Sequence, residues 1–163
     1  LGRNPCSRAV KILLELLKTD SNAYVRKATA WSLSNYPEAP VLQPLIYALK
    51  NDVAAVRLWA SSSIAEAGSS SVNNADLATS ELLISLRIDN EPVVRSNCIW
   101  SLGRLYETLN AKRKLQLEDA FLNILKNDVE QSVRYEARIS LEQLESPSVQ
   151  ERLQKLLEEG LVV

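Results

Sequence analysis

Residues 50–64, KNDVAAVRLWASSSI, determine the fold because the chain writes this pattern four times. Aligned on the arginine, the other copies are KTDSNAYVRKATAWSL (18–33), RIDNEPVVRSNCIWSL (87–102) and KNDVEQSVRYEARISL (126–141). Each copy has a basic residue two positions before an Asp, then a Val-Arg pair, and then Ser followed by Leu or Ile. The Val-Arg pairs lie 31, 38 and 39 residues apart. Self-similarity at a period of about 20 to 50 residues predicts a solenoid of stacked repeats.

Each copy predicts two helices joined near the Asp. Apolar residues with the 3.6-residue period indicate the first, or A, helix of each pair, over residues 6–18, 41–50, 76–87 and 115–126. The Val-Arg pair lies near the start of the second, or B, helix, expected over residues 23–35, 53–67, 92–109 and after Asp128. A last helix over residues 147–160 is closed by Gly160. This pattern predicts nine helices and no strand.

Two connectors interrupt the regular pattern. Residues 68–74, GSSSVNN, are expected to be flexible, with Gly68 as a helix C-cap, and they account for the longer second step. The only dense basic cluster is Lys112-Arg113-Lys114, which we expect in a solvated connector.

The composition excludes several classes of function. With 163 residues and 46% hydrophobic content, the chain has room for one domain or one compact array of repeats. A net charge of −1 gives no field that would attract nucleic acid or an anionic membrane. Histidine is absent, which removes the commonest general base and zinc ligand. The two cysteines, Cys6 and Cys98, form neither a disulfide framework nor a metal motif. No run is apolar and long enough to span a membrane, so a reduced, cytoplasmic compartment is the expectation.

The repeated unit resembles the HEAT repeat, and in particular the short form found in phycobilisome-lyase-like HEAT proteins. The resemblance rests on Leu-x-x-x-Leu-Lys in the A helix, the Asp turn and the Val-Arg opening of the B helix, from about Cys6 to Leu144. It implies an all-α, right-handed α-solenoid. The expected repeats cover about residues 5–36, 40–68, 75–109 and 113–145, with a final capping helix at 147–160. Because the chain has no methionine and ends on Leu161-Val162-Val163, we also expect it to be part of a longer protein.

The residues around each arginine predict the core. The Val before the Arg shares a helix face with the residues three and seven after the Arg, so this face is expected to be buried. Cys98 lies on it and is interpreted as a small packed hydrophobe rather than a reactive thiol. The arginines, Arg26, Arg57, Arg95 and Arg134, could form a row that binds phosphate or carboxylate. The resemblance favours a structural role instead, because the recurrent Arg and Asp of HEAT-like arrays pair within and between repeats.

Large apolar side chains are predicted on the opposite sector of the B helices. Trp31 and Trp100 occupy the same slot, five residues after the Arg, which points about 150° away from the core at 100° per residue. The candidate partner-binding residues in this sector are Tyr24, Trp31, Leu58, Trp100 and Tyr135. The resemblance places the B helices along the inner groove of the solenoid. Two readings stay open: these residues contact a partner, or neighbouring repeats and a flanking segment cover them. Trp59 is expected in inter-repeat packing.

These observations favour a non-catalytic scaffold or adaptor that binds a protein partner in the B-helix groove. The resemblance supplies an alternative, a phycobilin lyase-like or phycobiliprotein-chaperone subunit that would hold a bilin in the same groove. No catalytic set, metal site or cofactor site emerges, so we expect no independent enzyme activity. Nucleic-acid binding is the least favoured class, since it needs a basic groove. Exposed end helices would also allow a homodimer.

Overall fold

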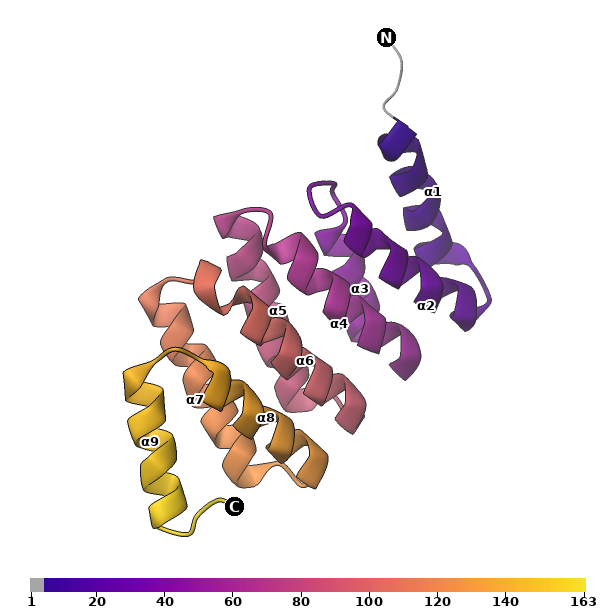
Figure 1. The fold of residues 1–163 in the computed structure, drawn as a ribbon. Helices are drawn as coiled ribbons and strands as arrows, with labels where there is room; N and C mark the ends of the chain where they lie inside the picture. The colour runs from indigo at the N-terminus through magenta and orange to yellow at the C-terminus, as the bar shows by residue number, and fades with distance from the viewer. Residues whose placement is uncertain (1–4) are drawn as a thin grey trace.

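The computed structural model describes residues 5–163, which form nine α-helices and two short 3₁₀ helices. Figure 1 shows the helices in two layers, with successive pairs stacked side by side and α9 at the C-terminal end. The A helices are α1 (Pro5–Thr19), α3 (Leu42–Asn51), α5 (Val72–Ile88) and α7 (Ala111–Asn127). The B helices are α2 (Ala23–Ser32), α4 (Ala54–Gly68), α6 (Pro92–Leu105) and α8 (Gln131–Gln143). The 3₁₀ helices η1 (Leu33–Asn35) and η2 (Tyr106–Thr108) extend α2 and α6, and α9 spans Pro147–Glu158.

The predicted all-α solenoid is confirmed. Helices pack in sequential pairs around one cluster of buried apolar residues that extends from Val10 to Val162. The residue expected at the centre of each buried B-helix face is small, and Ala60, Cys98 and Ala137 are fully buried. Small side chains at these positions let neighbouring helices approach closely. None of the helices in residues 5–163 has the length and apolar character needed to cross a membrane.

Two A helices begin four residues earlier than the sequence pattern suggested. Ser71 caps α5 by accepting a hydrogen bond from the Asn74 amide, and Asn110 caps α7 by accepting one from the Arg113 amide. Most of the stretch 68–74 is therefore not a flexible loop, and the longer step adds helical turns to α5. The basic cluster 112–114 likewise lies in the first helical turns of α7 rather than in a connector.

Gly68 was interpreted wrongly as a C-cap. It is the last residue of α4, and only Gly160 among the described glycines has a positive φ. A Cβ on Gly68 would lie 2.7 Å from the Ala78 Cβ and 3.2 Å from the Leu105 Cδ2. Glycine is required at position 68 because α5 and α6 pack too close to this end of α4 to leave room for a side chain.

Serine hydroxyls join neighbouring B helices. The Ser63 hydroxyl on α4 donates to the Ala30 carbonyl on α2 (2.6 Å), and the Ser101 hydroxyl on α6 donates to the Ser61 carbonyl on α4 (2.8 Å). Both serines occupy the slot six residues after the repeat arginine and are fully buried. In the second and third repeats, the recurrent Ser of the sequence pattern thus gives close, hydrogen-bonded contact with the preceding B helix.

Candidate functional site

The outward sector of the B helices carries the aromatic residues that the sequence singled out. Trp31 on α2 is 56% exposed and Trp100 on α6 is 43% exposed. Tyr24 and Tyr135 are more exposed still, near the first turns of α2 and α8. Leu58 on α4 differs, because it is partly buried against the core. We name these five residues the B-helix face. Large aromatic groups exposed on one side of a monomer are typical of a contact surface.

Neighbouring side chains fix the orientation of the two tryptophans. The Trp59 ring packs edge to face against Trp31 with centroids 6.3 Å apart, so Trp59 joins α4 to α2 as expected for inter-repeat packing. The Arg104 guanidinium lies 5.0 Å from the Trp100 ring centroid and forms an ion pair with Glu66 of α4. A held ring loses less conformational freedom on binding, which favours its use as an anchor.

The four repeat arginines lie apart from this face, in a ladder along the turns between A and B helices. Arg26, Arg57 and Arg95 each bind the Asp of the following repeat with two hydrogen bonds, to Asp52, Asp89 and Asp128, at 2.8–2.9 Å. Each also donates to the backbone carbonyl of the Asp in its own repeat. These guanidiniums are used within the fold, and the structure does not present them as a row of free anion-binding groups.

The last arginine of the ladder has a different environment. Arg134 donates to the Asp128 carbonyl at 2.6 Å, and no carboxylate in the described residues lies within ion-pair distance of its guanidinium. At the other end, Asp20 supplies its carbonyl to Arg26, but no arginine or lysine of the described residues pairs with its carboxylate. Each end of the ladder therefore has an open half, meaning one charged residue without its partner: among the described residues, Asp20 has no arginine and Arg134 has no aspartate.

Electrostatics inside the ladder favour the charged forms. Burial by itself would raise the pKa of the Asp128 carboxyl, but hydrogen bonds from Arg95 and from the Glu130 amide outweigh burial and lower it. The pKa of Asp52 is lowered in the same way by Arg26 and the Val53 amide. Such bidentate, charge-assisted pairs fix the spacing between successive repeats.

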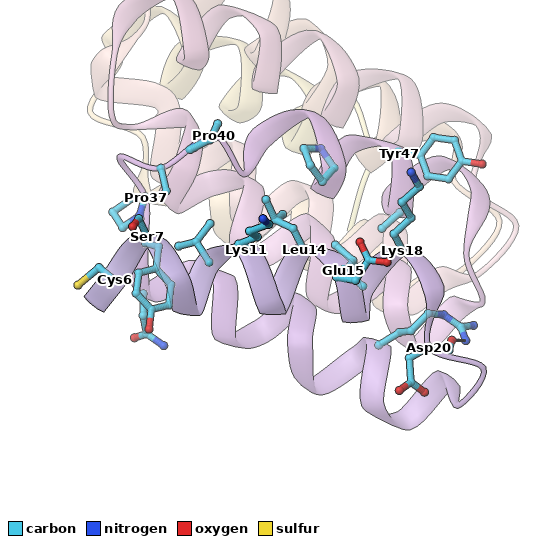
Figure 2. Close-up of a pocket in the computed structure, with 18 of the residues that line it drawn as sticks. Cys6, Ser7, Lys11, Leu14, Glu15, Lys18, Asp20, Pro37, Pro40 and Tyr47 are labelled. Atoms are coloured by element: carbon cyan, nitrogen blue, oxygen red, sulfur yellow. Dashed lines mark hydrogen bonds between the residues drawn. The ribbon is translucent and has the colours of Figure 1, made fainter. Parts of the chain in front are cut away.

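A cleft of about 1280 Å³ lies between α1, α3 and the loop that connects the first two repeats. Figure 2 shows Pro37 and Pro40 near the end marked by Cys6, with Tyr47 near the end marked by Lys18. Its apolar wall includes Val10 and Leu14, and charged α1 side chains stand at its rim.

The cleft exists because α3 is short. It begins three residues before Leu45, whereas α5 and α7 begin ten residues before Leu82 and Phe121 in the same slot. Two helical turns are thus missing beside the first half of α1. Ion pairs at 2.6 Å join α3 to α5 (Lys50 to Glu81), α5 to α7 (Arg113 to Asp76) and α7 to α9 (Arg152 to Asp119). None joins α1 to α3 in the described residues. The sequence pattern did not identify this cleft, although the short 31-residue step is its signal.

Groups that could support chemistry are few in the part of the chain that the structure describes. No group of three or more Cys, Asp or Glu side chains is placed to hold a metal ion there. Burial raises the pKa of the Cys98 thiol well above its usual value, so this thiol is neutral. The buried Tyr106 hydroxyl donates to the Glu118 carboxylate at 2.5 Å. Burial and, to a smaller extent, this hydrogen bond raise the pKa of Tyr106 to about 12. The Tyr106–Glu118 pair joins η2 to α7. Neither residue lines the cleft or belongs to the B-helix face.

Comparison with known proteins identifies the repeats. Residues 1–65 match the family model described as HEAT repeats, and residues 133–159 match the one described as PBS lyase HEAT-like repeat. No curated protein sequence matches the chain.

Solved structures with a similar fold include the following two. One is the crystal structure of an engineered protein, 19% identical with a TM-score of 0.62, which matches 85% of this chain; the chain spans 63% of that protein's length. The other is a designed armadillo repeat protein in complex with the peptide (KR)4, 21% identical with a TM-score of 0.63, covering 93% of this chain and 82% of that one. At these identities the likeness concerns the fold alone.

Proposed function

The chain is a HEAT repeat protein, and from that premise we propose that it is a non-catalytic scaffold or adaptor whose B-helix face holds a protein partner. The observation that carries this proposal is the exposure of Trp31 and Trp100 in the same slot of α2 and α6. Arrays of this fold commonly bind proteins, and the designed armadillo neighbour was solved with a peptide.

Covering the exposed part of the two tryptophans would contribute a large share of a binding energy. A tryptophan buries about 150–250 Å² when it is fully covered, so the exposed fractions of Trp31 and Trp100 correspond to roughly 65–140 Å² each. At about 25 cal/mol per Å², covering each ring stabilises a complex by about 2–3 kcal/mol. A micromolar complex has a standard free energy of about −8 kcal/mol, after the cost of association. The tryptophans would thus act as anchors, with polar contacts around them.

The geometry suits an extended or helical segment that crosses the stacked B helices. Trp31 and Trp100 are two helices apart, and packed helices lie about 8–10 Å apart, so the anchors are separated by roughly 20 Å. Between them α4 presents the smaller Ser62 in the equivalent slot. A partner that places two apolar side chains about six extended residues apart would contact both rings.

An affinity pull-down from source-cell extract, with identification of the retained proteins, tests the proposal. The bait would be compared with a Trp31→Ser, Trp100→Ser double variant. Tyr47→Ser provides the matched control, because Tyr47 is an exposed aromatic residue on the A-helix α3, away from the B-helix face. We expect a partner that the parent and the control retain and the double variant loses. A partner retained equally by all three would refute the role of the B-helix face.

A second function is favoured by the match of residues 133–159 to the PBS lyase HEAT-like repeat. In that alternative the chain is a lyase-like or chaperone subunit of phycobiliprotein assembly, and the same aromatic face holds a bilin. Aromatic rings could stack on a tetrapyrrole, whereas catalysis would require groups from another subunit. A bilin mixed with the chain should then show an absorbance shift and induced circular dichroism. Neither signal would appear if the face binds only protein.

A further inference from the structure

The two ends of the array are built differently. At the C-terminal end, Arg138 and Glu142 of α8 occupy the slots that hold Ala30 and Ser34 in the first repeat, and they pair with each other at 3.0 Å. Gly160, with φ of 66°, turns the chain so that Val162 packs into the core. A polar outer face of this kind is typical of a capping repeat. The outer face of α8 is therefore polar, although Arg134 on this helix has no carboxylate partner in the described residues.

The N-terminal end exposes residues that every later repeat buries. Ala9, Leu13 and Leu16 of α1 and Val25 of α2 are only partly buried. Their equivalents are buried in all three later repeats: Val41, Ala78 and Leu117; Leu45, Leu82 and Phe121; Ala48, Ser85 and Ile124; Val56, Val94 and Val133. Ile12 beside them is 52% exposed. We name Ala9, Ile12, Leu13, Leu16 and Val25 the N-terminal end face.

This face is the side from which a preceding A helix would pack. Ile12 and Leu16 occupy the slots of Pro44 and Ala48 in α3, and both of those residues line the cleft toward α1. The same side of α1 meets no helix within the described residues. Ile12 and Leu16 are apolar even though no described residue covers this side of α1. Apolar residues at these positions indicate that another helix packs here as one does in an internal repeat.

Asp20 defines the chemistry of that occupant. Each equivalent aspartate, Asp52, Asp89 and Asp128, receives a guanidinium from the B helix before it. The Asp20 carboxylate accepts a hydrogen bond from the Asn22 amide at 2.8 Å and has no ion-pair partner in the described residues. An arginine fork would find the same carboxylate geometry at the end of α1 that it finds at each internal turn.

We propose that the N-terminal end face is a docking surface for a further helical hairpin of HEAT type, whose second helix supplies an arginine to Asp20. The hairpin extends the solenoid in the N-terminal direction, covers Ile12 and Leu16, and completes the open half of the ladder. A second copy stacked head to tail does not meet these requirements, because α9 and the polar outer face of α8 would meet the apolar end face. This inference is independent of the B-helix face.

A fusion tests the proposal with a hairpin of known structure. A copy of residues 72–110, which contains α5, α6 and Arg95, is joined to residue 3. In this register the copied Arg95 precedes Asp20 by 33 residues, as Arg95 precedes Asp128. The tether keeps the hairpin at a high effective concentration, so packing on the face is measured without a separate binding step. The readout is hydrogen exchange of the α1 amides, with sedimentation velocity to report the oligomeric state.

We expect exchange in α1 to slow about tenfold or more in the fusion relative to the parent chain. Arg95→Gln in the copy, or Asp20→Asn in the receiving chain, should remove part of that protection, and the two changes together should remove no more than one alone. In the unfused chain Asp20→Asn should leave exchange unchanged. Unaltered α1 exchange with a freely exchanging appended hairpin would overturn the proposal, and so would equal protection without the arginine. A dimer of the parent chain that Ile12→Glu dissociates would show instead that a second copy covers this face.

Discussion

The ladder predicts that two arginines of the same sequence motif contribute very differently to stability. The side chains of Arg95 and Asp128 are only 9% and 5% exposed, and they share two hydrogen bonds of 2.9 Å. Arg95→Met keeps the aliphatic stem but leaves the Asp128 carboxylate with only the Glu130 amide as a hydrogen-bond donor among the described residues. Removing one member of a buried pair costs about 3–5 kcal/mol, because the other charge stays buried without its partner. We expect a loss of about 3 kcal/mol in the free energy of unfolding.

Arg134→Met is the matched control. Arg134 makes one hydrogen bond to a carbonyl and has no carboxylate partner in the described residues, so its loss should cost about 1 kcal/mol. Urea denaturation monitored by far-UV circular dichroism measures both values. An unchanged m-value shows that the substitutions have not altered the surface exposed on unfolding. Asp128→Asn combined with Arg95→Met should cost less than the sum of the two, with a coupling of about 1–3 kcal/mol. Equal costs for the two arginines, or additivity in the cycle, would refute the ladder as the element that joins the repeats.

Three further outcomes follow from particular residues. Gly68→Ala should destabilise the chain by about 1–3 kcal/mol because its Cβ would overlap Ala78, whereas Gly103→Ala, with no atom within 4 Å, should stabilise α6 by about 0.5–1 kcal/mol; thermal unfolding that shifted the same way for both would contradict this. Asp52 and Asp128 have lowered pKa values in the folded state, so the stability they contribute is present above the unfolded pKa of about 3.9 and is lost as the pH falls through the lower folded pKa; an acid titration of unfolding should show this loss, and Asp128→Asn should weaken it. Tyr106, whose pKa is raised to about 12, should give an ionisation step near that pH in an absorbance titration at 295 nm, and Tyr106→Phe should remove this step; a titration near pH 12 that the substitution leaves unchanged would be inconsistent with the Tyr106–Glu118 contact.

The sequence pattern was sufficient for the fold because the repeat is local. Each Val-Arg motif lies on a B helix, and the buried slots counted from it, such as Cys98 and Leu102, are fully buried as predicted. The helix starts were harder to predict. Ser71 and Asn110 lie next to other polar residues, and only the tertiary fold shows which of them caps a helix. Gly68 was misread because a glycine after an apolar run fits both a C-cap and a close helix contact.

The candidate site was predictable in part. The slot five residues after the arginine correctly indicated exposure for Trp31 and Trp100, since helix periodicity alone fixes that direction. Leu58 is less exposed than the helical wheel suggested, because it packs against the buried core cluster, a contact that a single-helix projection cannot contain. The α1–α3 cleft was not foreseen, since it results from turns that are missing from α3 rather than from any motif.

A photo-crosslinking experiment tests most directly whether the B-helix face binds a protein. A photoreactive amino acid would replace Ser62 of α4, between the two tryptophans, and in a second sample Asn123, an exposed residue of the A-helix α7. After irradiation in source-cell extract, the crosslinked proteins are identified from each position. We expect a defined protein adduct from position 62 that is lost in the Trp31→Ser, Trp100→Ser background, and no adduct of that protein from position 123. The same adduct from position 123, or adducts from position 62 that persist without the tryptophans, would contradict it.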